Sequence, residues 1–507
     1  MKFLWSAVRA SLLASVVAIA STASAGPLPP PKWGNPTCSV ESGDRDLKKQ
    51  LLQAAQIDPA AKLQYEKKIE AHRAALVDCR ERTWPEHQAV WLRLYDYDAQ
   101  PGVLEDVLDR IVNRGYNRVF VEVFYDGRVL LPVADNPTPW RSVMAEAVAA
   151  GKVEADYDLW AEVIRKGRDR GLEIYGWSFA LNFGYGYREV PDRSEALARN
   201  GAGENSIANA RFDPVALGNG KAFYEDAYET EHLFADPYSD AARADLLGAI
   251  SAIVERDPDG MLFDYVRYPT TFLRQSVVTR PRQLWIYGSA SQQALMASLK
   301  SERERELMRR FLANDSLSAN DIREVDDQFA ADPPIFPTDL SATPAERQPR
   351  YVDYFWKLAV DHAYRGVLEF VDEISTPARD LNIPVGTVFF PGGNEFREGG
   401  YDSKMQPWDR FPSNLQRHPM SYATCPDGIC VADQVGEVRN QSETETDVCP
   451  VLAGTWGQSF SGHASLEIQM QAIRDRHTQL DCVSHFVYSW MEPDSDKARK
   501  TGIGTGD

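Results

Sequence analysis

Apolar residues along the chain follow two alternating spacings, which predict strands separated by helices. Short continuous apolar runs are typical of buried parallel strands. Eight such runs occur in the sequence: 89–94, 118–124, 172–177, 260–264, 383–390, 419–422, 451–456 and 483–490. Between them apolar positions recur at helical spacing, as between residues 103 and 112, where Gly115 predicts the end of the helix. Strands that alternate with helices form right-handed βαβ units, so eight of them favour a closed (β/α)8 TIM barrel over an open doubly wound sheet.

Three sections depart from this alternation. Residues 45–80 are charged and helix-forming, with a break at Asp58-Pro59, which predicts a helical hairpin packed outside the barrel. Residues 182–236 and 270–350 follow the third and fourth strands, where barrel enzymes carry the loops that build their sites. The second section contains a charged helical piece, 298–312. We interpret it as a lid or surface insertion; the alternative is a solvent-exposed segment without a function.

The first 25 residues have the layout of a cleaved secretory signal. Lys2 and Arg9 form a charged start, 10–20 is apolar, and Ala23-Ser24-Ala25 precedes Gly26. The apolar stretch is shorter than the roughly 20 residues that span a bilayer, although a retained anchor is the alternative. We therefore expect an exported protein, periplasmic or extracellular, with no transmembrane segment in the mature chain. The expected organisation is a signal peptide (1–25), a linker and helical extension (26–84), a barrel (85–495) with its insertion (270–350), and a tail (496–507).

Export changes the interpretation of the six cysteines, because oxidising compartments favour disulfides over thiol ligands. Six cysteines allow 15 pairings. We expect Cys38 to pair with Cys79 around the helical hairpin, Cys425 with Cys430 across a turn, and Cys449 with Cys482. A zinc site is disfavoured, since the chain has no C-x-x-C and no pair of histidines four residues apart. We expect neither a metal nor a cofactor.

Charge and composition exclude one class of partner. The chain has 507 residues, 74 acidic against 55 basic side chains, and a net charge of −19. Phosphate binding needs a basic surface, which argues against nucleic acid as the main partner. Hydrophobic residues make up 43% of the chain, as in a packed globular protein.

The most informative stretch for chemistry runs from Asp259 to Pro269. Its apolar strand ends at Asp264, and a carboxylate at this end of a barrel strand lies at the mouth of the site. Asp264 is a candidate nucleophile, or a stabiliser of an oxocarbenium-like transition state. We expect Arg267 to hold it ionised and lower its pKa, and Arg267 and Tyr268 to contact substrate. An ion pair at the barrel rim is the alternative.

The same stretch resembles the D-G-[apolar]3-D-Y-[apolar]-R-Y-P signature of the glycosyl-hydrolase-like family ten proteins. Other matches occur in the expected order, at 90–91, 171–177, 236–237, 419–422, 454–457 and 485–489, so the resemblance spans roughly Glu86 to Met491. These are exported bacterial (β/α)8 enzymes that include a divisome-localised peptidoglycan glycan hydrolase. The resemblance implies glycoside cleavage, in the characterised case of glycan strands stripped of their peptides. The long insertion, the extra cysteines and the N-terminal helices depart from the usual pattern.

Glycoside hydrolysis needs a second carboxyl group, because one group protonates the leaving oxygen while the other attacks or activates water. Glu122 lies within an apolar strand, where burial would raise its pKa as a general acid needs. Glu395 follows the fifth strand, and Glu492 follows the eighth. We favour Glu122, then Glu395, then Glu492, and the choice stays open.

Aromatic residues near strand ends are the second theme, since flat rings bind the apolar faces of sugars. The candidates are Trp177, Tyr422, Trp456, Tyr488 and Trp490. Asp126 and Asn182 are expected to orient sugar hydroxyls. The alternative is that several of the rings only fill the barrel. For His418 and His485, a hydrogen-bonded core position is at least as well supported as substrate contact.

These features predict an exported glycoside hydrolase that acts on a bacterial polysaccharide, with peptidoglycan glycan strands as the candidate substrate. One alternative is a catalytically inactive barrel that binds glycan. Another is a polysaccharide deacetylase, which would need an acid and a spaced histidine pair as metal ligands. The eight histidines contain no H-x-x-x-H.

Overall fold

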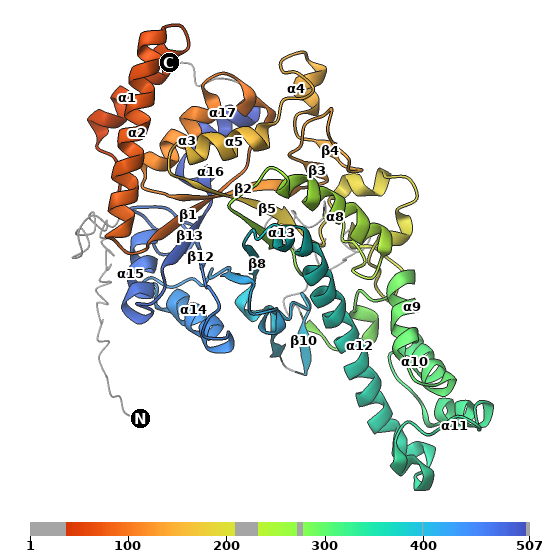
Figure 1. The fold of residues 1–507 in the computed structure, drawn as a ribbon. Helices are drawn as coiled ribbons and strands as arrows, with labels where there is room; N and C mark the ends of the chain where they lie inside the picture. The colour runs from red at the N-terminus through yellow and green to blue at the C-terminus, as the bar shows by residue number, and fades with distance from the viewer. Residues whose placement is uncertain (1–36, 208–231, 271–276, 398, 503–507) are drawn as a thin grey trace, which may run out of the picture.

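Eight parallel strands form a nearly closed barrel in the computed structural model, which describes residues 37–207, 232–270, 277–397 and 399–502 (Figure 1). The strands are β1 (His87–Leu92), β2 (Arg118–Tyr125), β5 (Glu173–Phe179), β6 (Gly260–Asp264), β8 (Val385–Phe389), β11 (Gln416–Pro419), β12 (Val451–Ala453) and β13 (Cys482–Phe486). β1 pairs with both β2 and β13, so the first and last strands meet. Two bridges, Arg417 to Val448 and Met420 to Val451, link the remaining edges. The predicted (β/α)8 barrel is therefore confirmed.

Large side chains fill the lower part of the barrel. The ring centre of Phe120 lies 5.6 Å from that of Tyr175 and 5.4 Å from that of His418, which joins three strands across the interior. Gly260 makes room for this layer, because a Cβ there would lie 2.0 Å from a Tyr175 ring carbon. The interior is a packed core, so the space for a ligand lies above it, at the carboxyl ends of the strands.

Helices surround the barrel as the apolar spacing predicted. They are α3 (Val103–Asn113), α4 (Ala145–Ala149), α5 (Leu159–Arg168), α8 (Asp240–Val254), α13 (Thr376–Asp380), α14 (Ile429–Gln441), α15 (Leu466–Arg476), α16 (Tyr488–Met491) and α17 (Pro493–Thr501). The apolar stripe of α3 is buried, and Ser239 caps α8 by accepting a hydrogen bond from the Ala242 amide at 3.3 Å. Such caps satisfy amides that have no partner within the helix, which fixes where the helix begins.

Shorter elements decorate the strand ends. β3 (Arg128–Val129) and β4 (Arg141–Ser142) extend β2, while β7 (Val277–Val278), β9 (Phe396–Arg397) and β10 (Gly400–Asp402) form a second small sheet. Short 3-10 helices occur at Asp96–Ala99, Tyr185–Glu189, Ser194–Ala196, Pro281–Gln283, Pro337–Ser341, Pro391–Asn394 and Trp408–Arg410. The sixth strand ends at Pro419, three residues earlier than predicted, so Tyr422 lies beyond it. Of the long loop predicted at 182–236, residues 208–231 lie outside the described residues.

An N-terminal helical hairpin packs on one side of the barrel, as predicted. It consists of α1 (Ser42–Ala55) and α2 (Pro59–Glu81). A buried ionic cluster attaches it to α3: Asp109 pairs with Lys48 at 3.5 Å and Arg170 at 2.9 Å, and accepts a hydrogen bond from the Tyr65 hydroxyl at 2.8 Å. Because Lys48 and Tyr65 come from the hairpin and Arg170 follows α5, one carboxylate joins three parts of the chain.

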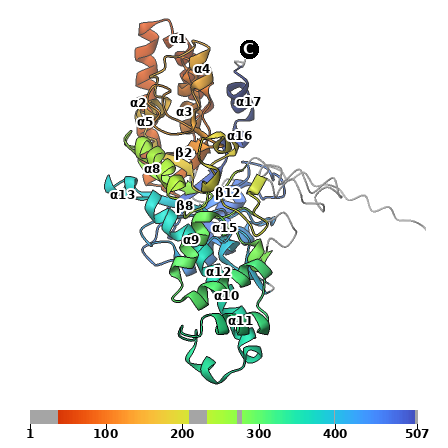
Figure 2. The same ribbon diagram turned by 90° about the vertical axis from the view of Figure 1, so that its right-hand side faces the viewer.

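A second group of helices projects from the opposite end of the molecule in both views (Figures 1 and 2). It contains α9 (Ser289–Ser298), α10 (Glu302–Asn314), α11 (Ala319–Gln328) and the 31-residue α12 (Pro344–Ile374). We call α9 to α12 the arm; only its α10 part was predicted from the sequence. A capping box at Thr343 starts α12 inside the predicted insertion, and the helix continues past residue 350 to the barrel.

All three expected disulfides are present: Cys38–Cys79, Cys425–Cys430 and Cys449–Cys482. They are compatible with an oxidising, extracellular environment. Within the described ranges, no helix combines the length and apolar character needed to cross a bilayer. In the same ranges, no three His, Cys, Asp or Glu side chains are grouped so that they could hold a metal ion.

Candidate active site

Asp264 ends β6 at the mouth of the barrel, where the sequence placed it. Its side chain lies on the same inward face of the strand as Leu262 and Gly260, because side chains alternate along a strand. Oδ1 accepts the backbone N–H of Tyr265 at 2.7 Å, and Oδ2 accepts the indole N–H of Trp177 at 3.3 Å. Trp177 comes from the neighbouring strand β5, so two adjacent strands fix the orientation of this carboxyl group.

Burial raises the pKa of Asp264 to about 6, although the Tyr265 amide, Arg267 and Trp177 each lower it. The expectation that Arg267 would give a lowered pKa is therefore wrong, because the loss of solvation outweighs its charge. Arg267 is itself buried: its guanidinium donates to the Tyr268 carbonyl at 3.0 Å and lies 4.8 Å from the centre of the Tyr265 ring.

Glu122 is the buried carboxyl group on β2. It shares the inward face of the strand with Phe120, and its side chain is 0% exposed. Both of its oxygens accept hydrogen bonds from Arg93, one from Nε and one from Nη2 at 3.1 Å. Burial raises the pKa of Glu122 to about 7; Arg93 opposes this rise, while the charges of Asp126 and Asp264 add to it. Asp264 has the smallest of these effects, and Glu122 is not among the groups that shift the pKa of Asp264.

The other two candidate acids have different surroundings. Glu395 follows the short helix Pro391–Asn394 and pairs with Arg397 at 2.5 Å. Burial raises the pKa of Glu437 on α14, and repulsion from Glu395 adds to this rise. Glu492 follows α16 and accepts hydrogen bonds from Arg110 and Arg114 of the α3 region. Neither they nor Glu122 contribute to the pKa of Asp264, but Asp264 adds a small part to the rise in the pKa of Glu122.

Aromatic rings gather around Phe486, the last residue of β13. Its ring centre lies 6.4 Å from Trp177, 6.2 Å from Tyr422 and 5.5 Å from Trp490. Asp264 adds to the raised pKa of Tyr422, which burial causes in the first place, so Tyr422 lies near the carboxyl group. Three of the five predicted rings thus meet at the mouth. Phe486 was missed, because an aromatic residue inside an apolar run has no feature that separates it from core.

Two other predicted rings lie elsewhere. Ser484 and Phe486 face the interior, so His485 between them faces the helices. Trp456 packs against His485 at 5.2 Å and donates to the Tyr116 hydroxyl at 3.1 Å, which places it in the outer layer. Tyr488 is buried against α17, with its hydroxyl 3.0 Å from the Ser495 hydroxyl. Trp456 and Tyr488 therefore pack in the structure and do not reach the mouth, in line with the alternative that some of the rings serve only packing.

The remaining polar candidates are also divided. Tyr268 is buried beside α12, where a Cβ on Gly366 would lie 3.2 Å from its hydroxyl. Asn182 is fully buried and accepts the Gly184 amide at 3.1 Å. Asp126 is exposed in the turn between β2 and β3. Asp126 is the one of these three whose charge acts on Glu122, as its effect on the Glu122 pKa indicates.

The two histidines that the sequence left open are core residues. Burial lowers the pKa of both His418 and His485 to about 3, so both are neutral at physiological pH. His418 packs on Phe120 in the barrel floor, and His485 lies 2.8 Å from the Tyr116 hydroxyl.

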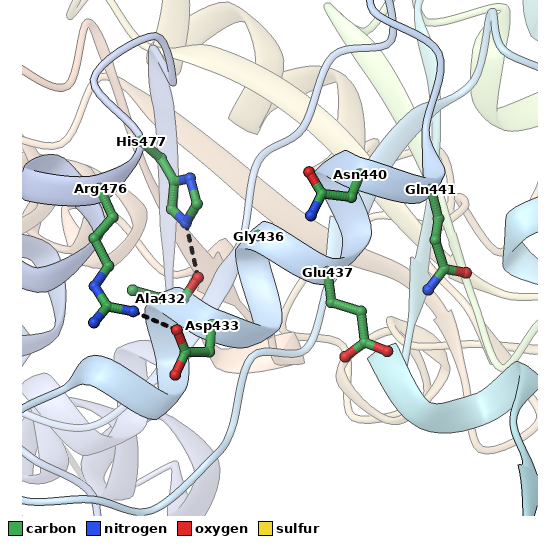
Figure 3. Close-up of a pocket in the computed structure, with 8 residues that line it drawn as sticks. All are labelled: Ala432, Asp433, Gly436, Glu437, Asn440, Gln441, Arg476 and His477. Carbon is green, nitrogen blue, oxygen red and sulfur yellow. Dashed lines mark hydrogen bonds and ion pairs between the residues drawn. The ribbon is translucent and has the colours of Figure 1, made fainter.

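A groove of about 480 Å³ lies on the outer helices (Figure 3). It follows α14 and the end of α15, and it is lined by Ala432, Asp433, Gly436, Glu437, Asn440, Gln441, Arg476 and His477. Arg476 pairs with Asp433, and His477 Nε2 lies 2.8 Å from the Ala432 carbonyl, so its polar groups bond to one another. The groove contains no aromatic platform and none of the mouth residues.

The fold and the mouth define a (β/α)8 barrel with one fully buried and one half-buried carboxyl group, both of raised pKa, and an aromatic wall. No protein-family model matches the sequence, and no curated protein matches it. Solved structures with a similar fold include a family 20 glycoside hydrolase, a β-N-acetylglucosaminidase (7% identity, TM-score 0.39, covering 82% of this chain and 66% of that one). They also include the family 20 β-N-acetylhexosaminidase of Streptomyces coelicolor A3(2) (9%, 0.36, 82% and 62%) and the α-galactosidase of Lactobacillus brevis (10%, 0.36, 86% and 43%). The chain spans less than two thirds of the length of each of these three proteins, and the likeness concerns the fold alone.

Proposed function

We propose that this protein is an exported glycoside hydrolase of the glycosyl-hydrolase-like family ten, acting on a bacterial polysaccharide. Peptide-stripped peptidoglycan strands are the first candidate substrate. The observation that carries the proposal is that one barrel mouth holds two carboxyl groups with raised pKa values, the half-buried Asp264 and the fully buried Glu122, and that the charge of Asp264 adds to the rise at Glu122. Glycoside cleavage requires two such groups on either side of the scissile bond.

The two pKa values suit a division of roles. With values of about 6 for Asp264 and about 7 for Glu122, near-neutral pH favours an ionised Asp264 beside a protonated Glu122. Glu122 would transfer its proton to the leaving oxygen as the glycosidic C–O bond breaks. The Asp264 carboxylate would attack the sugar carbon or stabilise its positive charge, and water would complete the hydrolysis. The rings around Phe486 supply apolar surface for the sugar faces.

The test measures reducing ends released from peptide-stripped peptidoglycan. Asp264→Asn and Glu122→Gln should each lower turnover by at least about 100-fold, the typical contribution of a positioned acid or base. Asp257→Asn is the matched control, because Asp257 is an exposed carboxylate in the turn before β6, at the other end of the same strand, paired with Arg168 at 3.2 Å. Near-normal turnover by Asp264→Asn would refute the assignment.

A glycan-binding barrel without hydrolytic activity is the second candidate function. The observation that favours it is the double hydrogen bond from Arg93, which occupies both oxygens of Glu122 and opposes its protonation. Wild-type protein that binds peptide-stripped strands tightly but releases no reducing ends, at pH values that cover the pKa of Asp264 (about 6) and that of Glu122 (about 7), would support this candidate against the hydrolase.

A further inference from the structure

Arg93 is a charged residue at the mouth that the proposed chemistry leaves without a role. It directly follows β1 and lies two residues after Trp91, whose ring contacts Phe120 and Trp177 inside the barrel. Residues two apart on a strand share a face, so the Arg93 side chain leaves the backbone on the side of the interior. Its signal in the sequence was a charged side chain within an apolar run, the same signal that identified Glu122.

The guanidinium of Arg93 is held on two sides. One edge bonds both oxygens of Glu122, and one face lies over the Tyr125 ring, 4.3 Å from its centre. A guanidinium has five N–H donors, and the bond to Glu122 uses two of them. Among the residues that the structure describes, Nη1 of Arg93 donates no hydrogen bond. A fixed edge of this cation is therefore free to bind a ligand.

The ion pair is asymmetric in its exposure. The Arg93 side chain is 37% exposed, while that of Glu122 is fully buried. The cation therefore faces the solvent of the mouth and the carboxyl group of Glu122 lies behind it, which gives this part of the wall a positive edge in a protein of net charge −19. Asp126 is the other charge nearby, and it is exposed in the adjacent turn.

We propose that Arg93 is a specificity-determining residue that binds a carboxylate carried by the glycan, so that the preferred substrate is an acidic polysaccharide. The planar N–H edge of arginine matches a carboxylate in geometry, which favours this group over a hydroxyl. β1 and β6 are three strand spacings apart, roughly 14 Å along the wall. Arg93 also bonds Glu122, the proposed acid, so the acidic sugar would lie next to the sugar whose bond is cleaved. This inference rests on the proposed function and names the substrate class of the same site.

Two kinds of sugar carry such a carboxylate: those with a lactyl ether, as in peptide-stripped peptidoglycan, and uronic acids. The probes are oligosaccharides of each kind, compared with the same molecules after methyl esterification, which removes only the charge. Binding is measured by calorimetry in Asp264→Asn protein, in which turnover is blocked. We expect each preferred free acid to bind at least about 10-fold more tightly than its ester, as a charge-assisted bond predicts. The arm with the larger ratio identifies the source of the carboxylate.

Replacing Arg93 alone would leave Glu122 buried without its partner, which endangers folding. The test variant is therefore the double substitution Arg93→Gln with Glu122→Gln, made in the Asp264→Asn background. Arg128→Gln is the matched control, since Arg128 is an exposed arginine of the neighbouring β3 whose ion partner, Glu146, lies on the surface at 3.8 Å. The double variant should lose the preference for the free acid, and the control should keep it.

The outcomes separate this inference from the function on which it rests. Equal binding of acid and ester, or a preference that survives the double variant, would overturn the role of Arg93 even if the wild-type protein cleaves glycan. An acid preference that depends on Arg93, in a protein that cleaves none of the probes, would support the recognition site and refute the hydrolase.

Discussion

Replacing Asp264 by asparagine should make the stability of the protein depend less on pH. In the unfolded chain Asp264 ionises with its ordinary pKa of 3.8, while burial raises the value in the folded state to about 6. Between these values the folded state keeps a proton that the unfolded state has lost, so this group lowers stability as the pH rises. The pKa values of Asp264 in the folded and unfolded states differ by about two units, which lowers the free energy of unfolding by about 3 kcal/mol at neutral pH.

The asparagine variant avoids this cost but loses one contact. Its Oδ1 can still accept the Tyr265 N–H, whereas its amide nitrogen cannot accept the Trp177 N–H that now lies 3.3 Å from Oδ2. That loss costs about 1 kcal/mol. The variant should therefore be about 1 kcal/mol less stable than the wild type below about pH 3, where the group is protonated in both states, and about 2 kcal/mol more stable near pH 7.5.

Urea unfolding of both proteins at a series of pH values measures this difference. Thermal midpoints are less suitable, since in a chain of this size 1 kcal/mol moves the midpoint by only about 1 °C. Asp257→Asn is the matched control, because Asp257 is an exposed carboxylate in a left-handed turn conformation (φ 56°) that asparagine tolerates, and it does not shift the pKa of Asp264 or Glu122. A difference between Asp264→Asn and wild type that stays constant with pH would refute the burial argument.

Three further predictions concern the acid, the hairpin and the barrel floor. If Glu122 is the acid, kcat/KM should fall tenfold per pH unit above about 7, and a rate that persists well above this pH would exclude the role. Replacing Cys38 and Cys79 by serine opens a 41-residue loop and should cost about 4 kcal/mol, seen as faster proteolysis of the helical hairpin; unchanged proteolysis would contradict this. Gly260→Ala should cost about 1–3 kcal/mol because its Cβ meets a neighbouring ring, whereas Gly248→Ala, with open space around its Cβ in α8, should stabilise by up to about 1 kcal/mol. If the urea midpoints of Gly260→Ala and Gly248→Ala move in the same direction, the argument that Gly260 makes room for the Tyr175 ring would be contradicted.

The barrel was predictable because its signal is local. Each strand is a short apolar run and each helix an apolar stripe, so the order of elements follows from the chain without knowledge of contacts. The arm was not predictable in the same way. Arg347 and Arg350 are tied to Asp326 and Asp339, so polar residues hold the far end of α12 where apolar spacing gives little signal. A helix stabilised by such pairs cannot be separated from a solvated loop by hydrophobic pattern.

The site was partly predictable for a related reason. A carboxylate inside an apolar run is conspicuous, which is why Asp264 and Glu122 could be identified. Whether its pKa rises or falls depends on distances that the sequence does not contain. Arg267, three residues from Asp264 in sequence, was expected to dominate; in the folded protein burial dominates. Arg93, 29 residues from Glu122 in sequence, is bonded to both of its oxygens.

Asp109 and Asp264 show how a structural carboxylate differs from one suited to chemistry in this barrel. Asp109 is buried with two cations and a hydroxyl, so its charge is satisfied by groups from three parts of the chain. Asp264 is held by one amide and one long indole hydrogen bond, and its pKa is raised to about 6. Taking a carboxylate out of water costs folding free energy when hydrogen bonds and opposite charges do not fully replace the lost solvation. The charge of such a carboxylate can still be stabilised by a bound substrate. The same reasoning applies to Arg93, whose pairing with Glu122 leaves an unused N–H edge facing the mouth. Asp264 and Arg93 therefore keep hydrogen-bonding capacity that the protein does not use, whereas Asp109 at the helical hairpin does not. This difference is the physical reason to expect a charged ligand at the barrel mouth and not at the hairpin.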